Sequence, residues 1–203
     1  MRWLLVLLYP LLLSLLFVRL SFTEAFVAFL YQRVELPPDP MPYELRLSIA
    51  KLGLRSVLSE EGMEEFKNSG LFNSREIKHM EDVKRLLSFF FTLLYVLSPL
   101  WLFFFFRLKS FKEKGFVLFS GGLLLELFAL FVIVVSLVAY NWLFEAFHNL
   151  FFDPYSWRFR DEDMLLRVYP MDFWFKATLY TAGSLFFFNL LLQLLGLYLW
   201  RRG

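Results

Sequence analysis

The sequence predicts an all-α membrane protein, with four transmembrane helices and a small helical extracytoplasmic cap. Of its 203 residues, 59% are hydrophobic and 28 are Phe, well above the content of soluble globular domains. Apolar runs of about 18 residues or more with few charges predict transmembrane helices. The four such runs cover residues 3–31, 86–106, 116–144 and 177–200. We expect residues 1–203 to form a single membrane domain.

The four runs differ in the charges that they carry. The first is interrupted by Arg19 and Glu24, and it is too long for a cleaved signal peptide. The second and fourth hold no charge, and the third holds only Glu126. Charged residues inside a membrane segment are candidates for function. At helical rise, Arg19 lies roughly 24 Å along its span and Glu126 roughly 15 Å along its own. A long Arg side chain spans that difference, so we favour a structural ion pair between Arg19 and Glu126.

The basic residues predict the orientation in the membrane. They flank the apolar runs at Arg2, at 107–114 and at 201–202, which makes those ends cytoplasmic by the positive-inside rule. Residues 33–84 and 145–176 then lie on the extracytoplasmic side. Their charges are roughly balanced, which favours a folded cap over a nucleic-acid surface. With no cysteine in the chain, no disulfide holds the cap and no thiol acts as a nucleophile.

The first cap segment combines turn signals with one amphipathic stretch. Four prolines in 34–44 predict an extended connector. Residues 43–58 place Leu and Ile on one helical face and charges on another, so they predict a short helix, broken or bent at Gly53. We expect residues 59–70 to form a polar loop.

A capping box marks the start of the next helix. Asn73 is a favoured N-cap residue, and Glu76 follows it by three positions. No Pro or Gly occurs between Ser74 and Pro99. One helix is therefore expected to run from the cap into the second transmembrane segment.

The two histidines of the chain are expected at one level. His79 lies about 10 Å above the hydrocarbon edge at helical rise, and His148 follows the third span at a similar level. Each has carboxylates on its own helical face: Glu76 and Asp82 for His79, and Glu145 for His148. A carboxylate beside an imidazole fixes its tautomer and raises its pKa. The alternative is that these are ordinary capping and interface groups.

A metal site built from the same histidines and carboxylates is an alternative to this interpretation. Two Glu-x-x-His motifs on different helices are typical of di-iron bundles, which need two further carboxylates at the same level. Glu24 supplies one, whereas Glu126 lies too deep. A mononuclear zinc site with two His and one carboxylate is a further alternative. We expect no metal and no cofactor.

The sequence contains no G-x-S-x-G turn, P-loop or dinucleotide-binding fingerprint. No serine stands in a recognisable nucleophile turn either. If the protein acts on an acyl group, the nucleophile therefore belongs to the substrate.

Two motifs carry a family resemblance: REIKHMEDVK and EAFHNLFFDPYSWRFRDEDMLLRVYPMDFW, at roughly 75–84 and 144–175. The chain resembles the lipoprotein intramolecular transacylases, small four-span proteins of the bacterial plasma membrane. The segment 34–72 carries no matching motif. The resemblance implies that diacylated bacterial lipoproteins are the substrates, and that the family's two histidines correspond to His79 and His148.

The resemblance also implies the reaction. The sn-2 acyl chain of the diacylglyceryl-Cys moves to the α-amine of the same Cys, giving a lyso-form, N-acylated lipoprotein. An amine with a pKa of about 7.7–8.0 must lose a proton to attack, and an imidazole near 6.5 is a suitable base. A second imidazolium protonates the leaving alkoxide. An ester that becomes an amide needs no ATP, and intramolecular reaction brings a large effective molarity.

Several side chains are candidates for supporting roles. Asp82 and Glu145 are expected to orient the imidazoles. The candidate oxyanion donors are Trp157, Arg158, Arg160 and Tyr169, and the sequence does not favour one of them over the others. The partners expected are lipoproteins and membrane lipids, with no nucleic acid. The alternatives in other classes are a non-enzymatic membrane scaffold and a metal-dependent lipid hydrolase.

Overall fold

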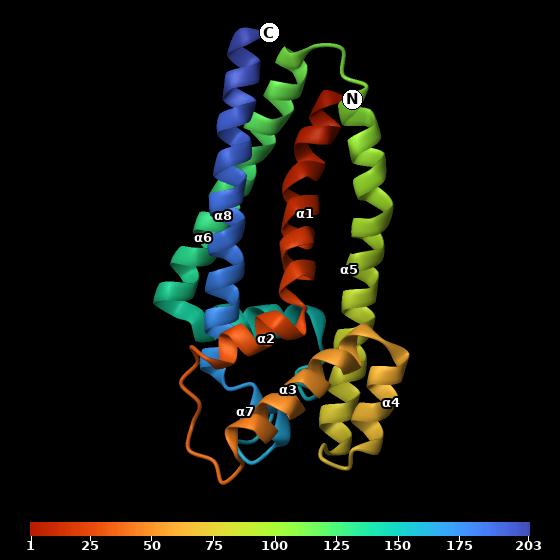
Figure 1. Cartoon of the computed structure of the whole chain (residues 1–203), viewed down its shortest axis with the longest axis vertical. Coiled ribbons are helices and arrows are strands. Elements are labelled where there is room, and N and C mark those ends of the chain that lie inside the picture. Colours follow the sequence, from red (N-terminus) through yellow and green to blue (C-terminus); the bar gives the residue numbers. More distant parts are fainter. The chain divides into compact units, whose positions relative to one another are not determined.

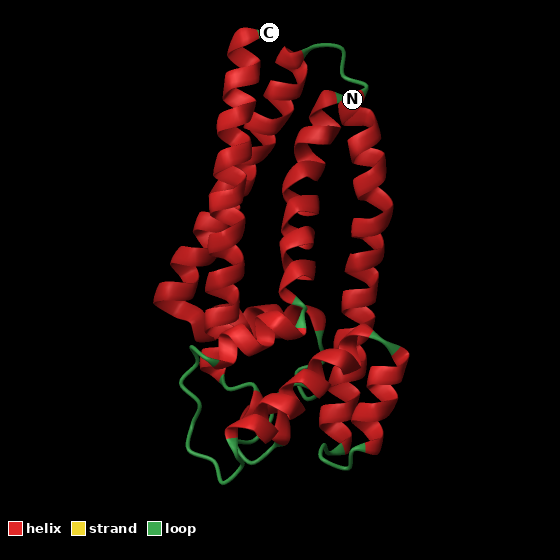
Figure 2. Cartoon of the chain, in the orientation of Figure 1, coloured by secondary structure: helices red, strands yellow, loops and turns green.

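The computed structural model describes all residues 1–203 and contains eight α-helices and no strand (Figures 1 and 2). The prediction of an all-α protein is confirmed. Four helices are long and apolar enough to cross a membrane: α1 (Arg2–Ser21), α5 (Ser74–Phe106), α6 (Phe111–Phe151) and α8 (Met171–Arg202). The shorter helices are α2 (Glu24–Tyr31), α3 (Tyr43–Leu58), α4 (Glu60–Asn68) and α7 (Met164–Val168).

The chain divides into two compact units. The first unit comprises Met1–Leu20, Phe91–Val138 and Leu179–Gly203. The second unit comprises Ser21–Phe90 and Ala139–Thr178. The expectation of a single membrane domain over residues 1–203 stays a prediction.

Within the first unit, α6 and α8 approach closely where both carry glycine. A Cβ added to Gly115 would lie 2.3 Å from the backbone nitrogen of Trp200 and 2.6 Å from the carbonyl oxygen of Gly196. A Cβ on Gly196 would lie 2.7 Å from the backbone nitrogen of Phe119. Small residues allow this backbone contact, which is a common basis of helix association in membranes.

A buried hydrogen-bond network connects three helices of the first unit. The Tyr9 hydroxyl donates to Oδ1 of Asn189 over 2.8 Å. Nδ2 of Asn189 donates to the carbonyl oxygen of Gly122 over 2.9 Å and to Oε1 of Glu126 over 3.0 Å. Asn189 is fully buried. The network satisfies polar groups that an apolar surrounding would otherwise leave without partners.

The predicted ion pair between Arg19 and Glu126 is wrong. Nε of Arg19 donates to the Tyr95 hydroxyl over 2.9 Å, and its guanidinium lies 5.4 Å from the centre of the Phe91 ring. Glu126 instead accepts the amide hydrogen bond of Asn189. An uncharged partner on α8 thus takes the place of the expected cation on α1.

In the second unit, the first apolar run breaks after α1. Helix α1 ends at Ser21, and α2 begins at Glu24. The backbone of Thr23 is extended between them, and its hydroxyl accepts the Phe26 N–H over 3.2 Å. The interrupted apolar run 3–31 therefore forms two helices, because Thr is a favoured N-cap that starts a new helix.

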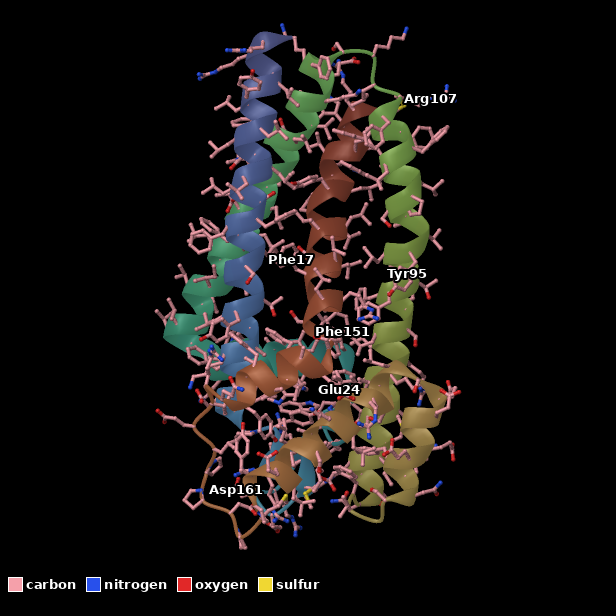
Figure 3. The ribbon with its side chains drawn as sticks, viewed as in Figure 1. Phe17, Glu24, Tyr95, Arg107, Phe151 and Asp161 are labelled. Carbon is pink, nitrogen blue, oxygen red and sulfur yellow. The ribbon has the colours of Figure 1, made fainter.

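Charged side chains then connect α2 to α3 and α4. Glu24, labelled in Figure 3, pairs with Arg55 over 3.2 Å and with Lys51 over 3.7 Å. Arg55 also pairs with Glu65 of α4 over 2.8 Å. Helix α3 packs against α2, α4 and α7 (Figure 1).

The predicted helix over 43–58 is confirmed as α3, but it is not broken at Gly53 and continues through this residue to Leu58. A Cβ at Gly53 would lie 2.8 Å from the hydroxyl oxygen of Tyr169. Glycine is therefore needed at this position for close packing of an aromatic ring on the helix, and a continuous helix tolerates it.

The predicted polar loop over 59–70 is wrong, since most of it forms α4. The Ser59 hydroxyl caps the helix by accepting the Gly62 N–H over 2.9 Å. Met63 and Phe66, three positions apart, are both buried. Two apolar residues at helical spacing are sufficient for a short helix that packs against α3.

Helix α5 begins as predicted. Oδ1 of Asn73 accepts the Glu76 N–H over 3.0 Å, and Glu76 Oε2 accepts the Asn73 N–H over 2.8 Å, which confirms the capping box. The other Glu76 oxygen accepts the N–H of Leu165 over 2.7 Å. A buried carboxylate thereby attaches α7 to the first turn of α5.

Helix α6 changes direction at Ala139, whose φ of −151° and ψ of 45° are not helical. Beyond this kink, the Tyr140 hydroxyl lies 3.3 Å from the Thr178 hydroxyl, and its ring contacts Phe175 at 5.3 Å between centroids. These contacts fix the last three turns of α6, which carry His148.

Candidate active site

The two histidines meet in the second unit. His79 comes from the second turn of α5, and His148 comes from the last turn of α6. Their ring centroids lie 6.0 Å apart, with 25° between the ring planes. The structure thus brings together the two imidazoles that the sequence places at one level, while their depth in the membrane stays a prediction.

Aromatic side chains enclose the pair. The His79 ring lies edge-on to Phe152 at 5.0 Å and to Phe159 at 5.4 Å. The His148 ring lies 4.0 Å from Phe144 and 4.8 Å from the indole of Trp157. We call these four aromatic residues the aromatic enclosure; an imidazole in such surroundings is more stable neutral than charged.

Hydrogen bonding distinguishes the two imidazoles. Nδ1 of His148 lies 2.8 Å from the carbonyl oxygen of Phe144, one helical turn earlier. A carbonyl oxygen only accepts, so Nδ1 carries the hydrogen and the lone pair of the neutral ring is on Nε2. Nδ1 of His79 is buried and has no hydrogen-bond partner.

The carboxylates expected beside the imidazoles are occupied elsewhere. Asp82 pairs with Lys78 over 3.1 Å and with Arg85 over 3.0 Å. Glu76 binds the backbone N–H groups of Asn73 and Leu165. Glu145 is exposed on α6, and no hydrogen bond joins it to His148. No hydrogen bond therefore joins a carboxylate to either imidazole, although burial lowers the pKa of His79 and the negative charge of Asp82 acts to raise it. The orienting roles expected of Asp82 and Glu145 stay predictions.

Of the four candidate oxyanion donors, only Trp157 lines the enclosure. It is buried, and its Nε1 has no hydrogen-bond partner. Arg158 is exposed, with its guanidinium 5.2 Å from the centre of the Trp157 ring. Arg160 is exposed and lies 3.7 Å from Glu162.

Tyr169 lies in a different part of the second unit. Its hydroxyl donates to the carbonyl oxygen of Ala50 on α3, and its ring packs against Phe173 and Trp174. Burial raises the pKa of the Tyr169 hydroxyl, so it stays protonated. This side chain connects α3 to the start of α8.

The histidine pair lies within the part of the chain that known proteins match. The family described as Lipoprotein intramolecular transacylase Lit matches residues 1–174. The chain belongs to this family. A relative from Aquifex aeolicus (strain VF5), called "Uncharacterized protein", is 46% identical over 187 residues, covering 88% of this chain and 85% of its own. No solved structure matches the chain.

The matched region of this transacylase family member contains every residue of the enclosure. Both sequence motifs, REIKHMEDVK and the stretch from Glu145 to Trp174, also fall inside it. The family consists of bacterial membrane enzymes, in agreement with four helices that are long and apolar enough to cross a membrane.

The candidate site residues predicted from the sequence left out three phenylalanines of the enclosure: Phe144, Phe152 and Phe159. Phe144 and Phe152 stand four positions before and after His148, so they share its helical face. This spacing is the signal by which they were identifiable. Phe159 gave no such signal, because it reaches His79 from the irregular segment after α6.

The same region holds further aromatic contacts but no cluster of metal ligands. Phe151, labelled in Figure 3, lies edge-on to Phe90 at 5.9 Å between centroids. No group of three or more His, Cys, Asp or Glu side chains that could hold a metal ion occurs in the structure. Glu24, the carboxylate that the di-iron alternative requires, pairs with Lys51 and Arg55.

Proposed function

We propose that this protein moves the sn-2 acyl chain of a diacylglyceryl-Cys lipoprotein to the α-amine of the same Cys, with His79 and His148 transferring the protons. Family membership supports the reaction class. The observation that carries the assignment of the residues is the pair of imidazoles from two helices, one buried and one half-buried, with ring centroids 6.0 Å apart. We further propose that the site faces the extracytoplasmic side of the plasma membrane, where the positive-inside rule puts both histidines.

The reaction makes one bond and breaks one. The amine nitrogen attacks the ester carbonyl carbon, the C–N bond forms, and the bond between that carbon and the sn-2 oxygen breaks. One proton leaves the nitrogen, and one proton reaches the glycerol oxygen. The product is an isomer of the substrate, so no other reactant is consumed.

We assign the proton acceptor to Nε2 of His148. The hydrogen bond from Nδ1 to the Phe144 carbonyl leaves the lone pair on Nε2. A positioned imidazole of this kind contributes about 10²- to 10⁴-fold to proton-transfer catalysis. A carbonyl partner fixes the tautomer without adding the negative charge that a carboxylate would bring.

We assign His79 to the leaving glycerol oxygen. Its Nδ1 is buried without a partner in the protein, so a substrate atom is free to occupy that hydrogen bond. Two imidazolium charges at this distance would repel each other. The pair therefore holds at most one extra proton at a time: His148 accepts it from the amine nitrogen, and it then moves by way of His79 to the glycerol oxygen.

A synthetic diacyl lipopeptide and the purified protein test the proposal. The lipopeptide is expected to keep its mass while its amine becomes blocked and one glycerol hydroxyl becomes free. A gain of one acyl mass would mean transfer from phospholipid, and a loss would mean hydrolysis. Heavy acyl chains appearing on light peptides in an isotope mixture would refute the intramolecular route.

The two histidines are tested by substitution. We expect His79→Ala and His148→Ala each to lower the rate at least about 100-fold, while both variants still insert and keep the melting temperature within a few degrees. Near-normal turnover in either variant would contradict the two-imidazole mechanism. Activity that survives a strong chelator would separate this mechanism from a metal-dependent lipid hydrolase.

A further inference from the structure

One polar atom of the enclosure has no role in the proton transfers described above. The indole Nε1 of Trp157 is buried and has no hydrogen-bond partner, although the side chain is only 8% exposed. Indole N–H is a donor only. Buried donors are nearly always paired in folded proteins, so one that lacks an acceptor requires an explanation.

Trp101 shows how the same side chain is used structurally in this protein. Its Nε1 donates to the carbonyl oxygen of Leu5 over 2.9 Å, which connects α5 to α1. Trp157 has no such backbone acceptor. Its ring instead contacts His148 at 4.8 Å and Phe144 at 6.1 Å between centroids. The unpaired N–H therefore belongs to the side chain that lies against the assigned base.

This placement has a chemical consequence. When the amine attacks the ester, negative charge develops on the carbonyl oxygen of that ester. The attacked carbon lies next to the amine, and the amine lies next to the base. A donor for that oxygen must lie within a few ångströms of the base, and it must be unpaired before the substrate arrives. Trp157 meets both conditions.

We propose that Nε1–H of Trp157 donates a hydrogen bond to the oxyanion of the tetrahedral intermediate; this inference rests on the proposed transacylase function. The other donors considered do not meet the conditions. The Tyr169 hydroxyl is taken by Ala50, and Arg158 and Arg160 are exposed to solvent. Trp157 is thus a catalytic residue that acts on charge, beside two histidines that move protons.

The test removes the N–H and keeps the ring. Trp157 is replaced by β-(3-benzothienyl)alanine, in which sulfur takes the place of N–H, and in a second variant by Phe. Loss of one oxyanion donor lowers kcat about 100-fold or more, with KM changed little. Trp142→Phe is the matched control, because Trp142 lies on α6 but is 61% exposed, and we expect it to keep wild-type kcat.

A second measurement separates oxyanion binding from packing. A phosphonate lipopeptide carries a tetrahedral P–O⁻ group in place of the ester carbonyl, and an sn-2 ether lipopeptide has no carbonyl oxygen. The benzothienyl variant is expected to lose affinity for the phosphonate by about the factor lost in kcat. Its affinity for the ether should equal that of the wild type.

Each outcome decides between the two proposals. Wild-type kcat in the benzothienyl variant, or equal loss of affinity for phosphonate and ether, overturns the role of Trp157 while the transacylase function stands. A wild-type protein that hydrolyses the lipopeptide or leaves it unchanged overturns the transacylase function, and the role of Trp157 with it.

Discussion

Glu76 is predicted to stabilise the site without taking part in the chemistry. The carboxylate is 1% exposed, and its two oxygens accept the N–H groups of Asn73 and Leu165 over 2.8 and 2.7 Å. Glu76→Ala leaves the buried Leu165 N–H without an acceptor, whereas water is able to reach the N–H of the exposed Asn73. At about 1–3 kcal/mol for one buried unsatisfied group, the free energy of unfolding should fall by about 1–3 kcal/mol.

Glu76→Gln refines this expectation. The amide keeps one acceptor oxygen but presents NH₂ to the other backbone N–H, so a smaller loss is expected. Thermal unfolding in detergent, followed by fluorescence, provides the measurement. Activity below the transition should fall further in the Ala variant, because α7 is released from the helix that carries His79.

Glu81→Ala is the matched control on the same helix. Its carboxylate is one-third exposed and forms a surface ion pair with Lys67 over 2.8 Å. Surface pairs of this type contribute about 0–1 kcal/mol. If Glu76→Ala unfolds at the same temperature as Glu81→Ala, the buried carboxylate does not hold α7 and the reasoning fails.

Two further predictions concern orientation and pH. In this cysteine-free chain, Ser69→Cys and Ser156→Cys should react with an impermeant maleimide in intact cells, and Ser110→Cys should not; labelling at 110 would reverse the proposed orientation. Bidentate hydrogen bonds from Arg167, over 2.7 and 2.8 Å, lower the pKa of Asp39. A lowered folded-state pKa gives stability that is complete above about pH 5 and is lost as the pH falls further. Asp39→Asn should therefore flatten the acid side of the stability profile, and an unchanged profile would contradict this.

Short sequence patterns predicted the features that depend on residues close together in the chain. The apolar helices follow from composition, since a backbone in lipid must satisfy its own hydrogen bonds. The capping box at Asn73 follows from two residues three positions apart. The common level of His79 and His148 follows from counting helical rise from the ends of apolar runs.

Features that depend on distant neighbours were not predictable in this way. The ion pairs of Asp82 are not among these features: Lys78 and Arg85 are four and three positions away on α5, so both pairs were predictable from helical spacing. The partner of Glu126 is Asn189, a residue far along the chain on α8. The burial of Met63 and Phe66, which makes α4 a helix, depends on the contact with α3.

The aromatic enclosure also bears on which nucleophile reacts. An ester beside a general base is open to attack by water as well as by an amine wherever water is able to bind. Phenyl rings such as Phe144, Phe152 and Phe159 offer no hydrogen bond to hold a water molecule against the carbonyl carbon. In the proposed reaction, these walls favour the tethered amine of the lipoprotein over water, and therefore aminolysis over the release of a free fatty acid.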